Sequence, residues 1–389
     1  MGKRLTVCLL CAALALPGAA SALSNAPLED SAPEKYDCAA ALLVEPSSGQ
    51  IVFAVNANEK RPVASVTKIM TILLACEAVE RGDIDLSDRV QVSANAAGMG
   101  GSQVLLDAGE TQTVSELLKS VIVGSANDSA VALAEYIAGS APLFVDRMNR
   151  RAAELGMEDT AFVNCTGLPA DGQHTTARDV AAMAVELSKH DLYYDYSTIW
   201  LEDFTHESGR VTTLTNTNKL IRQYDGCDGL KTGSTSEAGY CMAASAKRGG
   251  MRLVAVVLGA TSGKERFRTA SQMLDYGFAS YRLYPVAEKG ATVRGRMPVT
   301  GSQKDSVALA LDGDVTLLVK KGGESAVSLA ADLPQSLSAP VTAGEAVGWV
   351  NVLKDGETVA QIRVVSAEDA PLRGLSDGLG VVFRAWCFQ

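Results

Sequence analysis

The stretch RPVASVTKIMTILLACEAVER, residues 61–81, holds the strongest helical pattern of the chain, and the helix expected over 66–81 is closed by Gly82. Ser65 and Lys68 stand where this helix begins and form the only Ser-x-x-Lys of the sequence. Residues three apart share one face of a helix, with Cβ atoms roughly 5–6 Å apart. The lysine amine can therefore reach the serine hydroxyl without any loop to hold it, which predicts a serine nucleophile with a lysine base.

Such a base must lose its charge near neutral pH. The pKa of the lysine must fall by about 3, or roughly 4 kcal/mol, through burial and a second nearby cation. The candidate second cation is Lys231, in the triplet Lys231-Thr232-Gly233, which we place just before a strand predicted over 240–246. A glycine in such a position allows the backbone to approach a ligand closely.

A Ser-x-Asn tripeptide that could add a relay hydroxyl and a positioning amide occurs twice. Ser93 and Asn95 stand in a small-residue, glycine-rich stretch that we interpret as a surface loop. Ser125 and Asn127 follow an apolar run and open a predicted helix, which is the more rigid support for a functional side chain. We therefore assign the function to Ser125 and Asn127.

Other chemistries find little support. The three histidines, His174, His190 and His206, stand beside polar or charged residues and are expected to be solvated. There is no Gly-x-Ser-x-Gly, no His-Glu-x-x-His and, beyond residue 22, no Cys-x-x-Cys, so neither a metal nor a cofactor is expected. The net charge is -10 and no dense basic patch occurs, which argues against a nucleic-acid partner.

The remaining pattern predicts an α+β fold, in which an antiparallel sheet is flanked by helices, followed by a smaller β-rich domain. Strands are expected over 39–44, 51–55, 240–246 and 252–259, and helices over 114–123, 128–138, 144–155, 176–189 and 267–281. Beyond about Pro285 the helical periodicity disappears, and short strands are expected over 307–311, 315–319, 347–353 and 358–365.

The first residues have the order of a secretory signal: Lys3 and Arg4, an apolar run from Leu5 to Leu16, and the small-x-small site Ala20-Ser21-Ala22. We expect an exported protein at the outer face of the cytoplasmic membrane or in the cell wall. The expected organisation is a signal peptide over 1–22, a linker over 23–35, a catalytic domain over 36–282, a β-rich domain over 285–370 and a tail over 371–389.

Two features of the exported chain are left open. Six cysteines follow the signal, an even number that permits disulfides, yet Cys76 and Cys241 lie in apolar patterns that favour buried free thiols. The tail carries an apolar stripe that begins at Leu372 and is compatible with an amphipathic helix on a membrane surface. Gly374, Gly378 and Gly380 weaken such a helix by about 1 kcal/mol each, so a docked or frayed terminus is an equal alternative.

The order Ser-x-x-Lys, Ser-x-Asn, Lys-Thr-Gly resembles the penicillin-binding D-alanyl-D-alanine carboxypeptidases of the low-molecular-mass serine type. The similarity runs from about Tyr36 to Tyr281. It includes Gly124-Ser125-Ala126-Asn127-Asp128, Asp228-Gly229-Leu230-Lys231-Thr232-Gly233 and Ala238-Gly239-Tyr240. The β-rich second domain and the tail resemble the family less specifically.

The resemblance implies a role for each site residue. Ser65 attacks the bond between two D-alanines of a peptidoglycan stem pentapeptide, Lys68 takes its proton, and Ser125 passes a proton to the leaving amine with help from Lys231. Asn127 holds the substrate amide, and the backbone N–H groups of Ser65 and Ser234 form the oxyanion hole. Thr232, Lys231 and Arg266 hold the terminal carboxylate, beside Gly233, and β-lactams are covalent inhibitors at Ser65.

Three alternatives remain open at this point. Within enzymes they are a β-lactamase and a D,D-endopeptidase that cuts cross-links. The middle motif Ser-Ala-Asn and the lack of a distinct deacylating glutamate segment depart from class A β-lactamases. A wall-binding protein without enzymatic activity is the alternative from a different class, and the intact Ser65, Lys68 and Lys231 argue against it.

Overall fold

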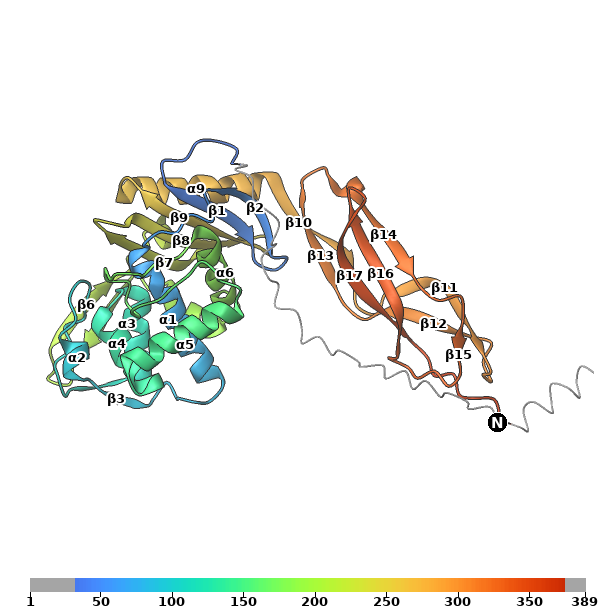
Figure 1. The fold of residues 1–389 in the computed structure, drawn as a ribbon, viewed down its shortest axis with the longest axis horizontal. Coiled ribbons are helices and arrows are strands. Elements are labelled where there is room, and N and C mark those ends of the chain that lie inside the picture. The colour runs from blue at the N-terminus through green and yellow to red at the C-terminus, as the bar shows by residue number, and fades with distance from the viewer. Residues whose placement is uncertain (1–31, 375–389) are drawn as a thin grey trace, which may run out of the picture. The chain divides into compact units, whose positions relative to one another are not determined.

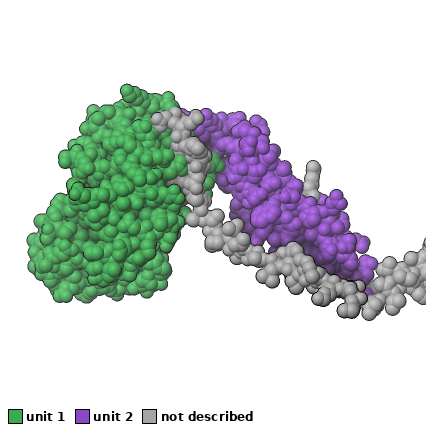
Figure 2. All heavy atoms as spheres, viewed as in Figure 1, with its two compact units in different colours: residues 1–247, 252–273 green, residues 248–251, 274–389 purple. Residues whose placement is uncertain are grey.

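The computed structural model describes residues 32–374, which form two compact units (Figures 1 and 2). One unit holds the described residues up to 247 together with 252–273, and the other holds 248–251 and those from 274 onward. In the part of the chain that is described, no helix combines the length and apolar composition needed to cross a membrane. The predicted signal peptide over 1–22, most of the linker and residues 375–389 of the tail lie outside the described residues.

The first unit is built on a five-stranded sheet whose strands run in the order β2-β1-β9-β8-β7. The bounds are β1 Ala40–Glu45, β2 Gln50–Val55, β7 Cys227–Thr235, β8 Gly239–Arg248 and β9 Met251–Ala260. Strand β1 is buried along its whole length and pairs antiparallel with β2 and β9. Strand β7 pairs antiparallel with β8 and forms one edge of the sheet, so its other side is free to face the active-site helices.

Helices cover both faces of this sheet. Helix α9 (Gly263–Ser280) runs along one face, and the helices that follow β2 gather on the other (Figure 1). Their bounds are η1 Ala64–Thr67, α1 Lys68–Glu80, α2 Ala94–Ala97, α3 Val114–Val123, α4 Asn127–Ala138, α5 Ala141–Glu154, α6 Ala177–Leu187, α7 Asp191–Ser197 and α8 Leu220–Gln223. Two small hairpins complete the unit, β3 Arg89–Gln91 with β4 Thr111–Thr113 and β5 Leu201–Thr205 with β6 Val211–Thr215.

Helix α1 is central because it is apolar on all sides, as a core helix must be. Ten of its thirteen residues are buried, and it packs against α3, α4, α5 and α6. Hydroxyl caps fix where three of these neighbours begin. Thr113, Ser140 and Thr176 each accept a hydrogen bond from the backbone N–H three residues later, at the starts of α3, α5 and α6.

The second unit is rich in β-structure and has its own core. Its larger sheet has the order β14-β16-β17-β12-β11-β15, and β10 pairs with β13. The bounds are β10 Tyr281–Ala287, β11 Thr292–Thr300, β12 Ser306–Leu311, β13 Val315–Lys320, η2 Glu324–Ala326, β14 Val327–Asp332, β15 Leu337–Ser338, β16 Ala346–Lys354 and β17 Glu357–Ser366. Val307, Val352 and Val364 are fully buried at its centre.

The structure confirms the predicted fold class, the first hairpin and the helices over 114–123 and 128–138. Two local features differ from the predictions. Residues 231–233 precede the predicted strand, which is β8, but they themselves lie within another strand, β7. Helix α9 begins at Gly263, four residues before the predicted start. Leu372, the first residue of the apolar tail stripe, forms a β-bridge with Ser302 and is therefore extended at this position.

Candidate active site

Ser65 and Lys68 meet at the start of the central helix. Ser65 lies in η1, and Nζ of Lys68, in the first turn of α1, lies 3.0 Å from its Oγ. The same amine donates a 2.6 Å hydrogen bond to the backbone carbonyl of Thr166. The Lys68 side chain is 0% exposed, so the two bonds replace water around a buried amine.

Burial changes the acid–base behaviour of Lys68. Desolvation lowers its pKa from 10.5 to about 7, although Cys165 and the carboxylate of Asp128 oppose the change. Asp128 does not pair with the amine directly. Its carboxylate instead accepts the backbone N–H groups of Val104, Leu106 and Ser129. Lys68 therefore has the pKa that a general base requires near neutral pH.

A second buried lysine faces the second serine. Lys231, from β7, is 1% exposed, and its Nζ donates hydrogen bonds to Oγ of Ser125 (2.8 Å) and to the carbonyl of Thr232 (2.9 Å). Burial holds its pKa well below the ordinary value, and the nearby charges of Lys68 and Arg266 lower it further. The two Ser–Lys pairs therefore lie in one site, although their residues are far apart in sequence.

Ser125 and Asn127 occupy the junction between α3 and α4. Ser125 has φ of +62°, in the left-handed region that non-glycine residues rarely adopt. Such conformations cluster at functional sites because the surrounding structure must impose them. The Asn127 side chain donates to the carbonyl of Gly100 (2.7 Å), and its buried Oδ1 has no hydrogen-bond partner among the described residues. An amide donor from a ligand would satisfy that oxygen.

The other Ser-x-Asn copy has a structural role. The predicted surface loop is wrong here. Ser93 caps the short helix α2 by accepting the N–H of Ala96, and the Asn95 side chain donates to Glu135. Neither residue contacts Lys68 or Lys231 among the described interactions.

The edge strand β7 lies against the segment that carries Ser65. A Cβ at Gly233 would stand 2.8 Å from the backbone nitrogen of Ser65 and 2.7 Å from the carbonyl of Val63, so only glycine fits there. The backbone of β7 next to Ser234 therefore comes close to the backbone of Ser65. The Ser234 side chain itself is exposed.

Thr232 belongs to the same strand, and Arg266 of α9 contacts the backbone of that strand. Oγ1 of Thr232 donates to Oγ1 of Thr217 (2.8 Å). Nη1 of Arg266 donates to the carbonyls of Gly233 (3.1 Å) and Cys241 (3.3 Å), and the guanidinium stacks on Phe267. Arg266 is 9% exposed, and its Nε has no partner among the described residues.

Sequence reasoning missed three residues that support the site residues. Thr166 contributes a backbone carbonyl, for which no side-chain signal exists. Asn164 supports it, because its Oδ1 accepts the N–H groups of Thr166 and Gly167 and so shapes the turn. Thr217, which accepts the hydrogen bond from Thr232, was also missed, and its position before the Lys-Thr-Gly triplet is the one signal in the sequence that could have suggested it.

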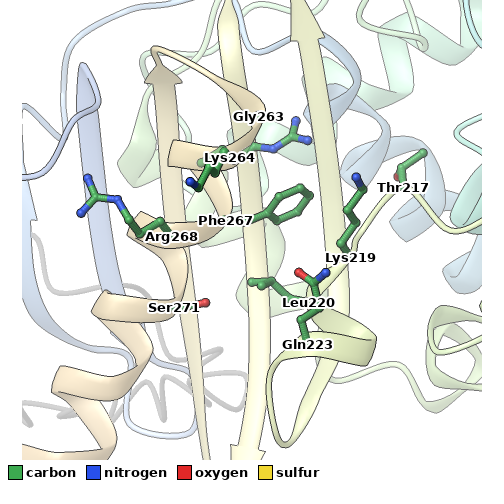
Figure 3. A pocket seen from close by; sticks show the side chains of 10 residues that line it. Thr217, Lys219, Leu220, Gln223, Gly263, Lys264, Phe267, Arg268 and Ser271 are labelled. Carbon is green, nitrogen blue, oxygen red and sulfur yellow. The ribbon is translucent and has the colours of Figure 1, made fainter.

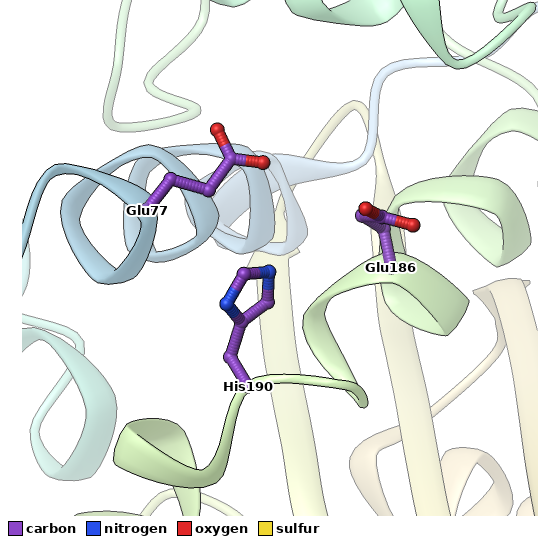
Figure 4. Close-up of side chains that lie close together, drawn as sticks. All are labelled: Glu77, Glu186 and His190. Carbon is purple, nitrogen blue, oxygen red and sulfur yellow. The ribbon is translucent and has the colours of Figure 1, made fainter. Parts of the chain in front are cut away.

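The histidines behave differently from one another. His206 was expected to be solvated, and this prediction was wrong. It is 2% exposed, with Nδ1 3.2 Å from Glu110 and Nε2 3.0 Å from Thr212. His190 lies near Glu77 and Glu186, and the three side chains place atoms that could bind a metal ion within 4.8 Å of one another (Figure 4). Both carboxylates there already pair with Arg151, at 2.8 and 3.0 Å, which leaves little charge for a cation.

The cysteines that the structure describes are all free thiols, and Cys76 and Cys241 are buried as predicted. Cys387 lies outside the described residues.

Comparisons with known proteins agree with this geometry. A family model described as D-alanyl-D-alanine carboxypeptidase matches residues 27–262, and one described as penicillin-binding protein 5, C-terminal domain, matches residues 281–371. The chain belongs to the D-alanyl-D-alanine carboxypeptidase family. The resemblance predicted from the three motifs is therefore confirmed.

Individual relatives cover nearly the whole chain. D-alanyl-D-alanine carboxypeptidase DacF of Bacillus subtilis (strain 168) is 39% identical over 385 residues, which is 99% of each chain. DacC of Escherichia coli (strain K12) is 33% identical and covers 90% of this chain and 87% of its own. Penicillin binding protein 5 from Haemophilus influenzae superimposes with a TM-score of 0.76 at 31% identity, covering 88% of this chain and 99% of its own.

The turn behind the nucleophile gives a first test, through Gly167. This residue has φ of +81°, and a Cβ there would collide with the carbonyl oxygen of Ala64, next to Ser65. Gly167→Ala should lower the free energy of unfolding by about 1–2 kcal/mol from the left-handed backbone and a further 1–3 kcal/mol from the collision. Displacement of Ser65 should slow its acylation by penicillin on the order of 10²-fold.

Gly172→Ala is the matched control, because this glycine has φ of +86° in the same loop but only Val163 Cγ2 within 4.0 Å. Denaturant unfolding and the rate of fluorescent-penicillin labelling check both variants. Equal losses in the two variants would contradict the close packing of Gly167 on Ala64.

Proposed function

We propose that this chain removes the terminal D-alanine from peptidoglycan stem pentapeptides through an acyl-enzyme on Ser65. The observation that carries the proposal is the pair of buried lysines, each within hydrogen-bonding distance of a serine hydroxyl in one site. A neutral amine beside Ser65 supplies a base. A second amine beside Ser125 supplies a hydrogen-bonded path for a proton.

Acylation begins at Ser65. Its Oγ attacks the carbonyl between the two D-alanines while Nζ of Lys68 takes the hydroxyl proton. The negative charge that develops on the carbonyl oxygen is stabilised by the backbone N–H groups of Ser65 and Ser234, next to Gly233. Ser125 relays a proton to the leaving D-alanine amine: it gives up its hydroxyl proton and receives the proton that Lys68 took from Ser65, so Lys68 is neutral again. The hydrogen bond from Lys231 keeps Ser125 aligned for that step.

The substrate is held at both ends of the scissile bond. On the acyl side, the unsatisfied Oδ1 of Asn127 accepts the N–H of the peptide. On the leaving side, Thr232, Lys231 and Arg266 hold the terminal carboxylate through hydrogen bonds, and the guanidinium of Arg266 supplies the opposite charge. Water then cleaves the ester with Lys68 again as base. A β-lactam acylates Ser65 in the same way, but its leaving amine stays tethered in the site.

The rival functions differ in the step after acylation and in the substrate. Rapid hydrolysis of the penicilloyl enzyme would favour a β-lactamase, and cleavage of cross-links would favour an endopeptidase. A wall-binding protein without activity has no need for two buried lysine amines, since burying an amine opposes folding. The hydrogen bonds of Lys68 and Lys231 to serines therefore favour an enzyme.

The location of the reaction is inferred from the substrate. Peptidoglycan lies outside the cytoplasm, and the charge, apolar run and small-x-small site of residues 1–22 support export. Peripheral membrane contact through the stripe of residues 371–389 is part of the same proposal, as are the domain limits 36–282 and 285–370.

The decisive test of the proposed function is the Ser65→Ala variant. Mass spectrometry of the purified chain should show one penicilloyl adduct on the wild type and none on the variant, and the variant should not release D-alanine from a D-Ala-D-Ala pentapeptide. Thermal unfolding serves as the control for folding. An adduct that persists on the folded variant would show that the nucleophile lies elsewhere.

The pKa of Lys68 predicts the pH dependence of acylation. Below pH 7 the amine is protonated and cannot accept a proton, so the rate should rise as the pH rises through about 7. At pH 6 the rate should be roughly one tenth of its alkaline plateau. Lys68→Arg keeps a charge that cannot be removed, so it should acylate orders of magnitude more slowly and without this rise. A wild-type rate that is flat from pH 5.5 to 8.5 would contradict a neutral Lys68 base.

Substitutions in the two Ser-x-Asn copies distinguish the proposed proton relay at Ser125 from the helix cap at Ser93. Ser125→Ala should slow peptide hydrolysis by about 10²–10⁴-fold, the usual contribution of proton transfer. Ser93→Ala removes only the cap of α2, so it should cost about 1 kcal/mol of stability and change hydrolysis less than about threefold. Measuring both variants on one pentapeptide decides the assignment, and a larger loss at Ser93 would reverse it.

A further inference from the structure

The two ends of the proposed active site are bounded in different ways. The carboxylate end borders a cavity of about 620 Å³, which Thr217 and Arg266 line together with the start of α9 (Figure 3). Asn127, at the acyl end, does not line this cavity. The loop of residues 99–106, between α2 and β4, lies against Asn127 instead. The orientation of the Asn127 amide therefore depends on how this loop is held.

Two backbone carbonyls of the loop fix Asn127. The carbonyl of Ser102 accepts the backbone N–H of Asn127 (2.7 Å), and the carbonyl of Gly100 accepts its side-chain amide (2.7 Å). A Cβ at Gly101 would stand 2.8 Å from Nδ2 of Asn127, so the loop packs directly on the amide. Because the loop holds Nδ2, the unpartnered Oδ1 is the atom that is left for the substrate.

The far end of the loop is held by Asp128. This residue is 0% exposed, and its carboxylate accepts the backbone N–H groups of Val104 (3.3 Å) and Leu106 (3.0 Å), one on each oxygen. Leu105, between them, has φ of +67°, a left-handed conformation that a non-glycine residue adopts where the surrounding structure imposes it. The hydrogen bonds on both sides of Leu105 help to impose it, so one carboxylate fixes the shape of this part of the loop.

The charge of Asp128 also reaches Lys68. The partners of its carboxylate in the described part of the chain are all backbone N–H groups, and such donors stabilise a charged carboxylate. Burial lowers the pKa of Lys68, and the charge of Asp128 opposes part of that change. Of the other titratable groups that act on Lys68, Lys231 carries no negative charge, and Cys165 is neutral near pH 7 because burial raises its pKa to about 11.

We propose that Asp128 is a positioning residue for the reaction: by holding the loop of residues 99–106, it sets the orientation of the Asn127 amide toward the acyl side of the substrate. The inference rests on the proposed function, in which Asn127 accepts the N–H of the peptide. The effect of Asp128 on substrate binding passes through Asn127. Its charge adjusts the pH range in which Lys68 acts as a base.

A double-mutant cycle tests whether Asp128 acts through Asn127. Asp128→Asn keeps the size of the side chain but places an NH₂ group opposite a backbone N–H, so one contact with the loop is lost. The value of kcat/KM for a D-Ala-D-Ala pentapeptide should fall about tenfold in Asp128→Asn and about 10²-fold in Asn127→Ala. The combined variant should match Asn127→Ala within about threefold, because losses that pass through one contact do not add.

The pH profile gives a readout that a change of shape alone would not move. Without the charge of Asp128 the pKa of Lys68 should be lower, so the rise in penicillin acylation expected near pH 7 should move to lower pH by about half a pH unit. Glu45→Gln is the matched control, because Glu45 is also 0% exposed and accepts the N–H groups of Ser47 and Ser48 in the turn after β1. It should keep the pH profile and stay within about twofold of the wild type in hydrolysis.

Thermal unfolding checks that each variant folds. If Asp128→Asn does not fold, Thr212→Val is used instead, since Oγ1 of Thr212 donates to the carbonyl of Val104 (3.0 Å) and holds the same loop from β6. It should lower kcat/KM in the wild type but not in the Asn127→Ala background, and it should leave the pH profile unchanged.

Two outcomes overturn the inference: losses that multiply in the cycle, or a pH profile of Asp128→Asn that coincides with that of the wild type. A wild type that does not hydrolyse the pentapeptide, or an Asn127→Ala variant as active as the wild type, would instead overturn the proposed function.

Discussion

The burial of two lysine amines without a bonded carboxylate is the constraint on which the active site depends. Moving an ammonium group out of water is costly, and a protein avoids the cost by releasing the proton. A fall in the pKa of Lys68 from 10.5 to about 7 corresponds to roughly 5 kcal/mol. Because the unfolded chain binds more protons between these two values, the stability of the protein rises with pH across that window. The fold thus maintains a basic amine at the expense of its own stability.

Several separate elements of the fold meet around the two buried lysine amines. Helix α1 supplies Lys68 and places it one turn from Ser65, a local relation that any helix would give. The turn at residues 164–167 supplies the carbonyl that holds the amine, and Gly167 lets that turn lie against Ala64. Strand β7 then closes the site from the other side, because Gly233 lets its backbone approach Ser65. Each contact removes water from the amines and so lowers their pKa.

How much could be predicted from the sequence depended on whether a relation was local. The Ser65–Lys68 pair followed from helical spacing, and the helices over 114–123 and 128–138 followed from their periodicity and caps. The Ser125–Lys231 pair joins residues 106 apart, and only the order of motifs in a known family suggested it. Strand β7 was missed because CDGLKTGST is rich in glycine and polar residues, and its burial comes from the helices around it. His206 was misread because charged residues beside it in sequence suggested exposure, whereas the fold places Glu110, far away in sequence, and Thr212 against its ring.

The central claim is that Lys68 is uncharged at the pH at which the enzyme works. Its most direct test is an NMR titration of the chain with ¹³Cε-labelled lysine, in which Lys68→Arg identifies the Lys68 signal and the exposed lysines serve as internal references. The account predicts that the Lys68 signal titrates near pH 7, well before the exposed lysines near pH 10.4. A Lys68 signal that titrates together with the exposed lysines would contradict it.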